Sequence, residues 1–188
     1  MARKAIQMVS VALGAVGLIG VIICCSLPEW IVGYGDDKEF HRGLWKTCVT
    51  YRTSPHVCGT IPNTMISSEI HAWRAMTVIS CLLCGLSLLL LIFGSDFTQC
   101  VQNQDTKPKM IKAAAVGLIL AGLLVIIPVS WVTHIFRNAR EGMMVGASIY
   151  IGFIAGVMMM LTGVLLCCLI RSGSSSSGGT VSFSSNRV

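Results

Sequence analysis

The stretch that decides the fold is GLWKTCVTYRTSPHVC, residues 43–58, in the polar segment between the first two apolar runs of the chain. A lone tryptophan, Trp30, precedes it, and the stretch combines a Gly-Leu-Trp triplet with Cys48 and Cys58. The two tryptophans and the leucine offer a small apolar nucleus. A disulfide between the cysteines would close a loop of the size that joins neighbouring strands. The stretch therefore predicts an extracellular, disulfide-closed module held between membrane helices.

The rest of the chain is too apolar for a soluble domain of its length. Of 188 residues, 54% are hydrophobic and 12% are charged, which makes the bilayer the expected solvent. Uncharged runs that reach the roughly 20 residues needed to cross a hydrocarbon core occur at residues 5–27, 75–93, 113–132 and 143–170. The first run exceeds the apolar region of a cleavable signal, so we expect it to be retained.

These runs predict a membrane α-helical fold, a four-transmembrane-helix bundle that occupies residues 1–171. Residues 28–74 and 133–142 would form two outer loops on one side of the membrane. Residues 172–188 begin with serine and glycine alone, a composition that cannot bury enough surface to fold. We therefore expect a disordered tail.

The orientation follows from the cysteines, because basic residues are divided evenly between the two sides and the positive-inside rule gives no answer. A stable disulfide requires an oxidising compartment. The loop that holds Cys48 and Cys58 should therefore face outward, with both termini cytoplasmic.

The net charge of +6 is scattered among loops and does not indicate nucleic acid. Lys107, Lys109 and Lys112 are expected to meet anionic lipid.

Several residues predict local structure. Glycines at packing spacings, such as Gly14, Gly17 and Gly20, predict close helix contacts, and Pro128 should bend the third helix near its outer end.

In the first outer loop, residues 30–32, Phe40 and residues 44–51 have the β-branched and aromatic content of strands. Ser67, Ser68 and Glu69 resemble the cap and first turn of a short helix that enters the second span.

The last two spans contain further distinctive residues, namely Pro128-Val129-Ser130-Trp131 with His134, Gly146 to Tyr150 and the pair Cys167-Cys168. Together with the first outer loop, they make the chain resemble the claudin family of tight-junction tetraspan proteins. The outer-loop signature of the family is matched by Trp30, Gly43, Leu44, Trp45, Cys48, Cys58 and Arg74.

The resemblance implies a left-handed bundle that carries an extracellular antiparallel sheet built from both outer loops. Such proteins polymerise with other claudins in one membrane, pair across the gap between cells, and line or seal paracellular pores. Trp30, Leu44 and Trp45 would anchor the sheet at the membrane surface, and the disulfide Cys48–Cys58 would join two strands.

The chain departs from the family pattern in four places. The segment from Trp30 to Gly43 is short, Ile31 stands where arginine is frequent, and the second outer loop lacks the usual Asn-Pro-Leu turn. The chain ends in Arg-Val rather than Tyr-Val. We therefore expect weak pairing with a facing cell, and Val188 is a candidate for binding a PDZ scaffold.

The charges of the first loop are segregated. Asp36 and Asp37 lie in an acidic cluster, whereas residues 43–68 carry only Lys46 and Arg52. Fixed charge close to a pore sets ion preference. This arrangement favours an anion-tolerant or sealing type with Arg52 as the main determinant, although all four charges could equally be solvated away from any pore.

The remaining cysteines leave alternatives open. Cys100, Cys167 and Cys168 are juxtamembrane candidates for acylation or simple packing residues. The C-x-x-C spacing of Cys81 and Cys84 is also found in membrane thiol oxidoreductases, an unfavoured alternative.

A further alternative is an auxiliary tetraspan that regulates another membrane protein. The sequence offers no phosphate loop and no paired histidines, so we expect no enzyme activity, metal or cofactor.

Overall fold

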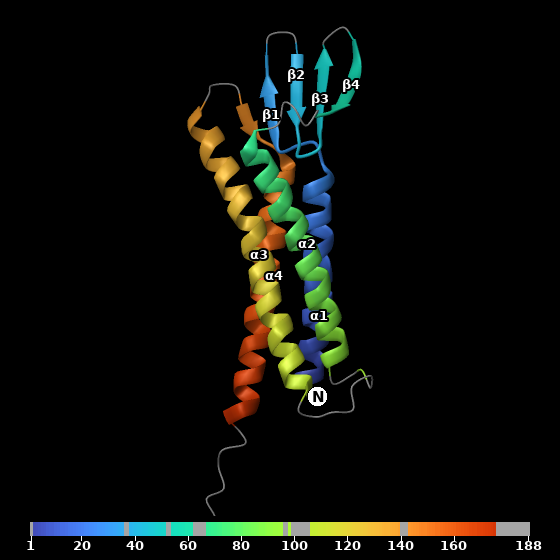
Figure 1. Cartoon of the computed structure of the whole chain (residues 1–188), viewed down its shortest axis with the longest axis vertical. Helices are drawn as coiled ribbons and strands as arrows, with labels where there is room; N and C mark the ends of the chain where they lie inside the picture. The colour runs from blue at the N-terminus through green and yellow to red at the C-terminus, as the bar shows by residue number, and fades with distance from the viewer. Residues whose placement is uncertain are drawn as a thin grey trace, which may run out of the picture.

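The computed structural model describes residues 2–35, 38–51, 54–61, 67–95, 98, 106–139 and 143–175. Four long helices run side by side, and one small sheet stands at one end of them (Figure 1). The helices are α1 (Ala2–Ser26), α2 (Ser68–Gly94), α3 (Thr106–Ala139) and α4 (Ala147–Ser175). Each is long and apolar enough to cross a membrane. The predicted fold class is confirmed.

The bundle is held together by small residues that let the helices approach closely. A Cβ added at Gly14 of α1 would lie 2.6 Å from Leu88 of α2, and one at Gly20 would lie 2.8 Å from the Cβ of Ala155 in α4. At Gly156 of α4 an added Cβ would lie 2.7 Å from Ile126 of α3. Close backbone approach of this kind replaces the hydrophobic driving force that helices lack inside lipid.

The helices differ from the expected spans mainly at their ends. The expected short helix at Ser67 is the first turn of α2, for which Ser67 is the N-cap residue. Helix α3 continues to Ala139, so most of the expected outer loop 133–142 is helical. The fourth span begins at Ala147 rather than at residue 143, because the residues before it form a strand.

Five strands form a single antiparallel sheet in the order β4-β3-β2-β1-β5. Strand β5 pairs with β1, so the segment before α4 closes one edge of a sheet that otherwise comes from the first loop. The strands are β1 (Ile31–Tyr34), β2 (Lys38–Arg42), β3 (Lys46–Tyr51), β4 (Ser54–Thr60) and β5 (Met143–Val145).

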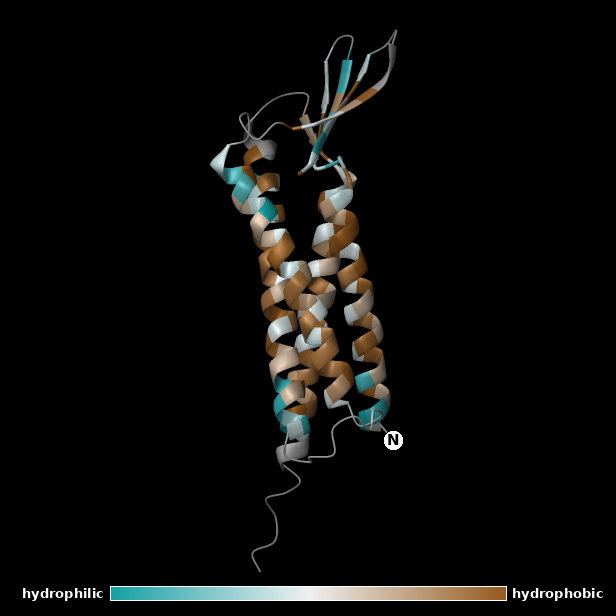
Figure 2. Ribbon diagram, turned by 45° about the vertical axis from the view of Figure 1, so that its right-hand side comes forward, coloured by the Kyte–Doolittle hydropathy of each residue, from teal (hydrophilic) through white to brown (hydrophobic). Residues whose placement is uncertain are grey.

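Apolar residues fill the middle of all four helices, and polar residues gather at both ends (Figure 2). The beginning of α1 and the end of α4 lie at the end of the bundle opposite the sheet (Figure 1). The sheet therefore projects from one membrane surface while both ends of the helical domain lie at the other. Pro128 lies inside α3, and a bend there stays a prediction.

Candidate interaction sheet and its attachment to the bundle

Trp30 joins the end of α1 to the start of β1. Its indole Nε1 donates a hydrogen bond to the carbonyl oxygen of Cys24 at 2.8 Å, and the side chain is only 2% exposed. The last four carbonyls of a helix have no partner within the helix, and Cys24 lies in the last turn of α1. Trp30 therefore satisfies a free helix carbonyl and fixes the direction in which the sheet leaves the membrane.

The Gly-Leu-Trp triplet forms the turn between β2 and β3 and packs on the same helix end. A Cβ at Gly43 would lie 2.5 Å from the Cα of Pro28 and 2.8 Å from the carbonyl oxygen of Leu27. No other residue fits this close approach of two backbone segments. Leu44 next to it is 2% exposed and belongs to the main hydrophobic core.

Arg74 connects this turn to α2. Its Nε donates a hydrogen bond to the carbonyl oxygen of Leu44 at 2.7 Å, and its guanidinium lies 4.8 Å from the ring centroid of Trp45. Trp45 in turn donates from Nε1 to the sulfur of Cys25 at 3.4 Å. One arginine thus holds the turn by a charged hydrogen bond and by a cation–π contact.

The disulfide Cys48–Cys58 lies between β3 and β4. The two residues are direct partners in the register of the pair, with their Cα atoms 4.0 Å apart. Cys48 is buried, whereas Cys58 is exposed on β4, one edge of the sheet. The bond therefore ties an exposed edge strand to the interior of the sheet.

Gly146 attaches the segment that precedes α4 to the segment that follows α1. A side chain there would collide with the backbone carbonyl of Glu29. The amide of Gly146 donates to the carbonyl oxygen of Trp30 at 3.1 Å, and that of Ser148 donates to Glu29 at 3.2 Å. This close contact places β5 beside β1 and starts α4 immediately beneath the sheet.

The other candidate residues fall into three groups. Lys46 is exposed at the start of β3, opposite Thr60. Cys167 is half-buried and Cys168 exposed near the end of α4 that lies away from the sheet. The candidates that lie outside the described residues are Asp36, Asp37, Arg52, Cys100 and Val188.

Cys81 and Cys84, the basis of the oxidoreductase alternative, are free thiols within α2. Cys84 is fully buried, with its sulfur 4.0 Å from the carbonyl oxygen of Gly14. This environment is that of a helix-packing residue. Among the described residues, no three His, Cys, Asp or Glu side chains gather in a way that could hold a metal ion.

Sequence reasoning did not identify three contributions to this region. The acceptor role of Cys25, the backbone contact of Glu29 and the place of Glu69 at a cavity beneath the sheet all depend on how the helices meet the sheet. Gly146 was expected as a packing glycine within the fourth span, and no local pattern indicated its contact with Glu29.

Comparison with known proteins is consistent with this geometry. Residues 4–166 match the model of the PMP-22/EMP/MP20/Claudin family. The chain is 33% identical to claudin-4 of Chlorocebus aethiops, over 89% of this chain and 88% of that protein. It is 32% identical to human claudin-3, over 87% and 81% of the two chains, and 33% identical to the claudin-like protein ZF-A89 of Danio rerio, over 89% and 88%.

Proposed function

Because this chain belongs to the PMP-22/EMP/MP20/Claudin family, we propose that it is a tight-junction tetraspan of the plasma membrane whose sheet contributes to a paracellular barrier. The role is structural rather than catalytic. The sheet faces the extracellular space and both termini are cytoplasmic, as an oxidised Cys48–Cys58 pair requires. Its partners are other claudins in the same membrane, and with lower affinity those of a facing cell.

The observation that carries this proposal is the attachment of the sheet to three different helices. Trp30 bonds to α1, Arg74 holds the central turn to α2, and Gly146 leads directly into α4. A surface that must repeat along a polymer needs a fixed orientation relative to the membrane. These contacts supply it, because they tie the base of the sheet to the sheet-side parts of α1, α2 and α4.

We further propose that the barrier is of an anion-tolerant or sealing type. Lys46 is exposed on β3, and neither β3 nor β4 carries an acidic side chain. Arg52 is the candidate determinant next to Tyr51. The cytoplasmic side would carry acylation at Cys100, Cys167 or Cys168, and Val188 would bind a PDZ scaffold.

The test is electrical. The chain is expressed in an epithelial monolayer that lacks its own junction strands, and transepithelial resistance and the salt dilution potential are measured at equal surface expression. We expect the resistance to rise, with a dilution potential that does not favour cations. Unchanged resistance with the protein present at cell contacts would contradict the proposal, and a clear cation preference would contradict its finer part.

An auxiliary role in regulating another membrane protein is the second candidate, and one observation favours it. Helix α3 ends at Ala139 and β5 begins at Met143, which leaves little chain for a turn that reaches a facing cell. Mixing expressing and non-expressing cells separates the two roles. Accumulation only at contacts between two expressing cells supports the junction role, whereas uniform surface distribution supports the auxiliary role.

A further inference from the structure

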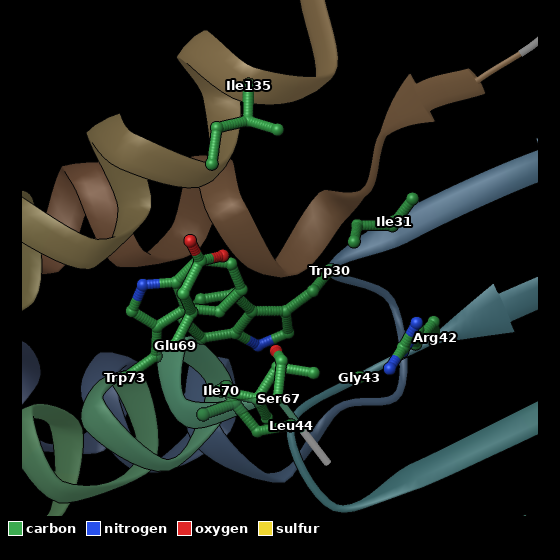
Figure 3. Close-up of a pocket in the computed structure, with 10 residues that line it drawn as sticks. All are labelled: Trp30, Ile31, Arg42, Gly43, Leu44, Ser67, Glu69, Ile70, Trp73 and Ile135. Atoms are coloured by element: carbon green, nitrogen blue, oxygen red, sulfur yellow. The ribbon is translucent and has the colours of Figure 1, made fainter. Parts of the chain in front are cut away.

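A cavity of about 240 Å³ lies beneath the sheet, between the first turns of α2 and the outer end of α3. Two charged residues line it, Arg42 at the end of β2 and Glu69 in the first turn of α2. The side chain of Trp30 extends from the start of β1 toward α2, which carries Glu69 and Trp73, and Arg42 lies on the strand side (Figure 3). The apolar lining residues are Trp30, Ile31, Leu44, Ile70, Trp73 and Ile135.

The two charges are not paired with each other, and Glu69 lies in the first turn of α2, where an acidic side chain stabilises the helix. Among the described residues, neither Arg42 nor Glu69 has an ion-pair partner. Arg42 is half-buried, and Glu69 is exposed. Opposite charges on two sides of one apolar cavity complement a ligand whose own opposite charges are separated. The partly exposed ring of Trp73 favours a ligand whose cation is a quaternary ammonium, which tryptophan attracts through its ring.

A second hollow of about 270 Å³ adjoins the first on the membrane side. It lies between α2 and α3, and it shares Glu69 and Trp73 with the upper cavity. Trp131 at its edge is 57% exposed, as expected of a tryptophan at a membrane–water interface. Apart from Glu69 its lining is wholly apolar and consists of Ala72, Trp73, Met76, Ile127, Pro128 and Trp131.

We propose that the two hollows together bind one zwitterionic choline phospholipid from the leaflet on the sheet side. The trimethylammonium group lies against Glu69 and the partly exposed ring of Trp73, and the phosphate lies toward Arg42. One acyl chain occupies the groove between α2 and α3. An anionic glycerol lipid would lack the cation that Glu69 attracts, and a primary ammonium is more strongly hydrated than a quaternary one.

The site also has a structural consequence. The lipid would fill the space between the sheet, α2 and the part of α3 that follows Pro128. Lipid binding at the cavity would not require polymerisation with other claudins.

The experiment measures which lipid the purified full chain retains. The protein in mild detergent is supplied with equal amounts of choline, ethanolamine and glycerol phospholipids that carry identical acyl chains, and bound lipid is identified by native mass spectrometry. We expect the choline lipid to be retained at least about fivefold over the others. Glu69→Gln should lower that retention about tenfold, which corresponds to ~1.4 kcal/mol, and Arg42→Gln should lower it several-fold.

Two further variants separate recognition from a general effect on folding. Glu69→Lys should exchange the preference from the choline lipid to the anionic glycerol lipid, which a merely structural role would not do. Glu39→Gln on β2, outside both hollows, is the matched control and should retain the choline lipid as the unchanged protein does.

Three results would overturn the proposal. The first is retention of all three lipids, or of a sterol, without headgroup preference, because the occupant would then be recognised by apolar contact alone. The second is an equal loss of every lipid in Glu69→Gln. The third is a loss in Glu39→Gln as large as that in Glu69→Gln.

Discussion

The bundle and the sheet are stabilised in different ways. Helix contacts in the bundle are made at many positions by small and apolar residues, such as Gly14 against Leu88 and Gly156 against Ile126. The sheet depends on a few individual contacts at its base, made by Trp30, Arg74 and Gly146. A single substitution should therefore displace the sheet while the bundle stays folded. Such a substitution should lower barrier function without lowering helical content.

The largest expected effect is that of breaking the disulfide. Cys48→Ser should free β4 from β3 and abolish the change in resistance, because loss of such a bond typically costs about 2–5 kcal/mol. Circular dichroism of the purified protein should still show the full helical content. The double variant Cys48→Ser, Cys58→Ser is the control for an unpaired thiol and should behave alike. Normal resistance at equal surface expression would show that β4 is dispensable.

Gly146→Ala tests the contact between β5 and the end of α1. The added Cβ meets the backbone of Glu29, and overpacking of this kind costs roughly 1–3 kcal/mol. We expect β5 to separate from β1, with faster hydrogen exchange at β1 amides. Gly85→Ala in α2 is the matched control, since nothing lies within 4 Å of a Cβ there. Similar exchange in both variants would contradict the role assigned to Gly146.

A smaller effect is expected for Arg74→Lys, which keeps the charge. Lysine lacks the Nε–H that bonds to Leu44 and the planar group that lies over Trp45, so the turn should lose about 1–2 kcal/mol of stability. Quenching of tryptophan fluorescence by an aqueous quencher should increase as Trp45 becomes more exposed. Lys109→Arg at the opposite end of the bundle should leave it unchanged. An unaltered signal in Arg74→Lys would mean that charge alone holds the turn.

The smallest effects concern charges on the sheet itself. Arg52→Glu and Lys46→Glu should each shift the dilution potential toward cations by no more than about fivefold in relative permeability, because exposed charges interact by ~1 kcal/mol or less. Neither should alter helical content or the disulfide. An unchanged ion preference in Arg52→Glu would place that residue away from the conducting path. Lys46→Gln separates the loss of a positive charge from the gain of a negative one.

The sequence predicted those parts of the fold that depend on local composition. Uncharged runs located the four helices, and β-branched and aromatic residues located β1 to β3. Strand β4 was implied only by the resemblance, through the disulfide at Cys58, because Pro55 and Gly59 are poor strand formers. Strand β5 was assigned to the fourth span, since Met143–Val145 continues the apolar run of α4.

The attachment of the sheet was only partly predictable. Trp30 and Arg74 could be selected by their resemblance to a family signature, but their acceptors are backbone carbonyls, which carry no sequence signal. The contact of Gly146 with Glu29 joins residues more than a hundred positions apart. The cavity that holds Glu69 and Arg42 likewise exists only after α2, α3 and the sheet have assembled. Contacts of this kind follow from tertiary structure rather than from any local pattern.

The position of β5 also has a consequence for biosynthesis. Strands β1 to β4 leave the ribosome before α2, whereas β5 is made only after three helices have been synthesised. Until then one side of β1 has no hydrogen-bonding neighbour, and an open strand edge of this kind readily pairs with other chains. Insertion of the last helix closes that edge. A nascent chain that stalls before α4 would thus expose an aggregation-prone edge, which gives the cell a direct means to distinguish finished from unfinished molecules.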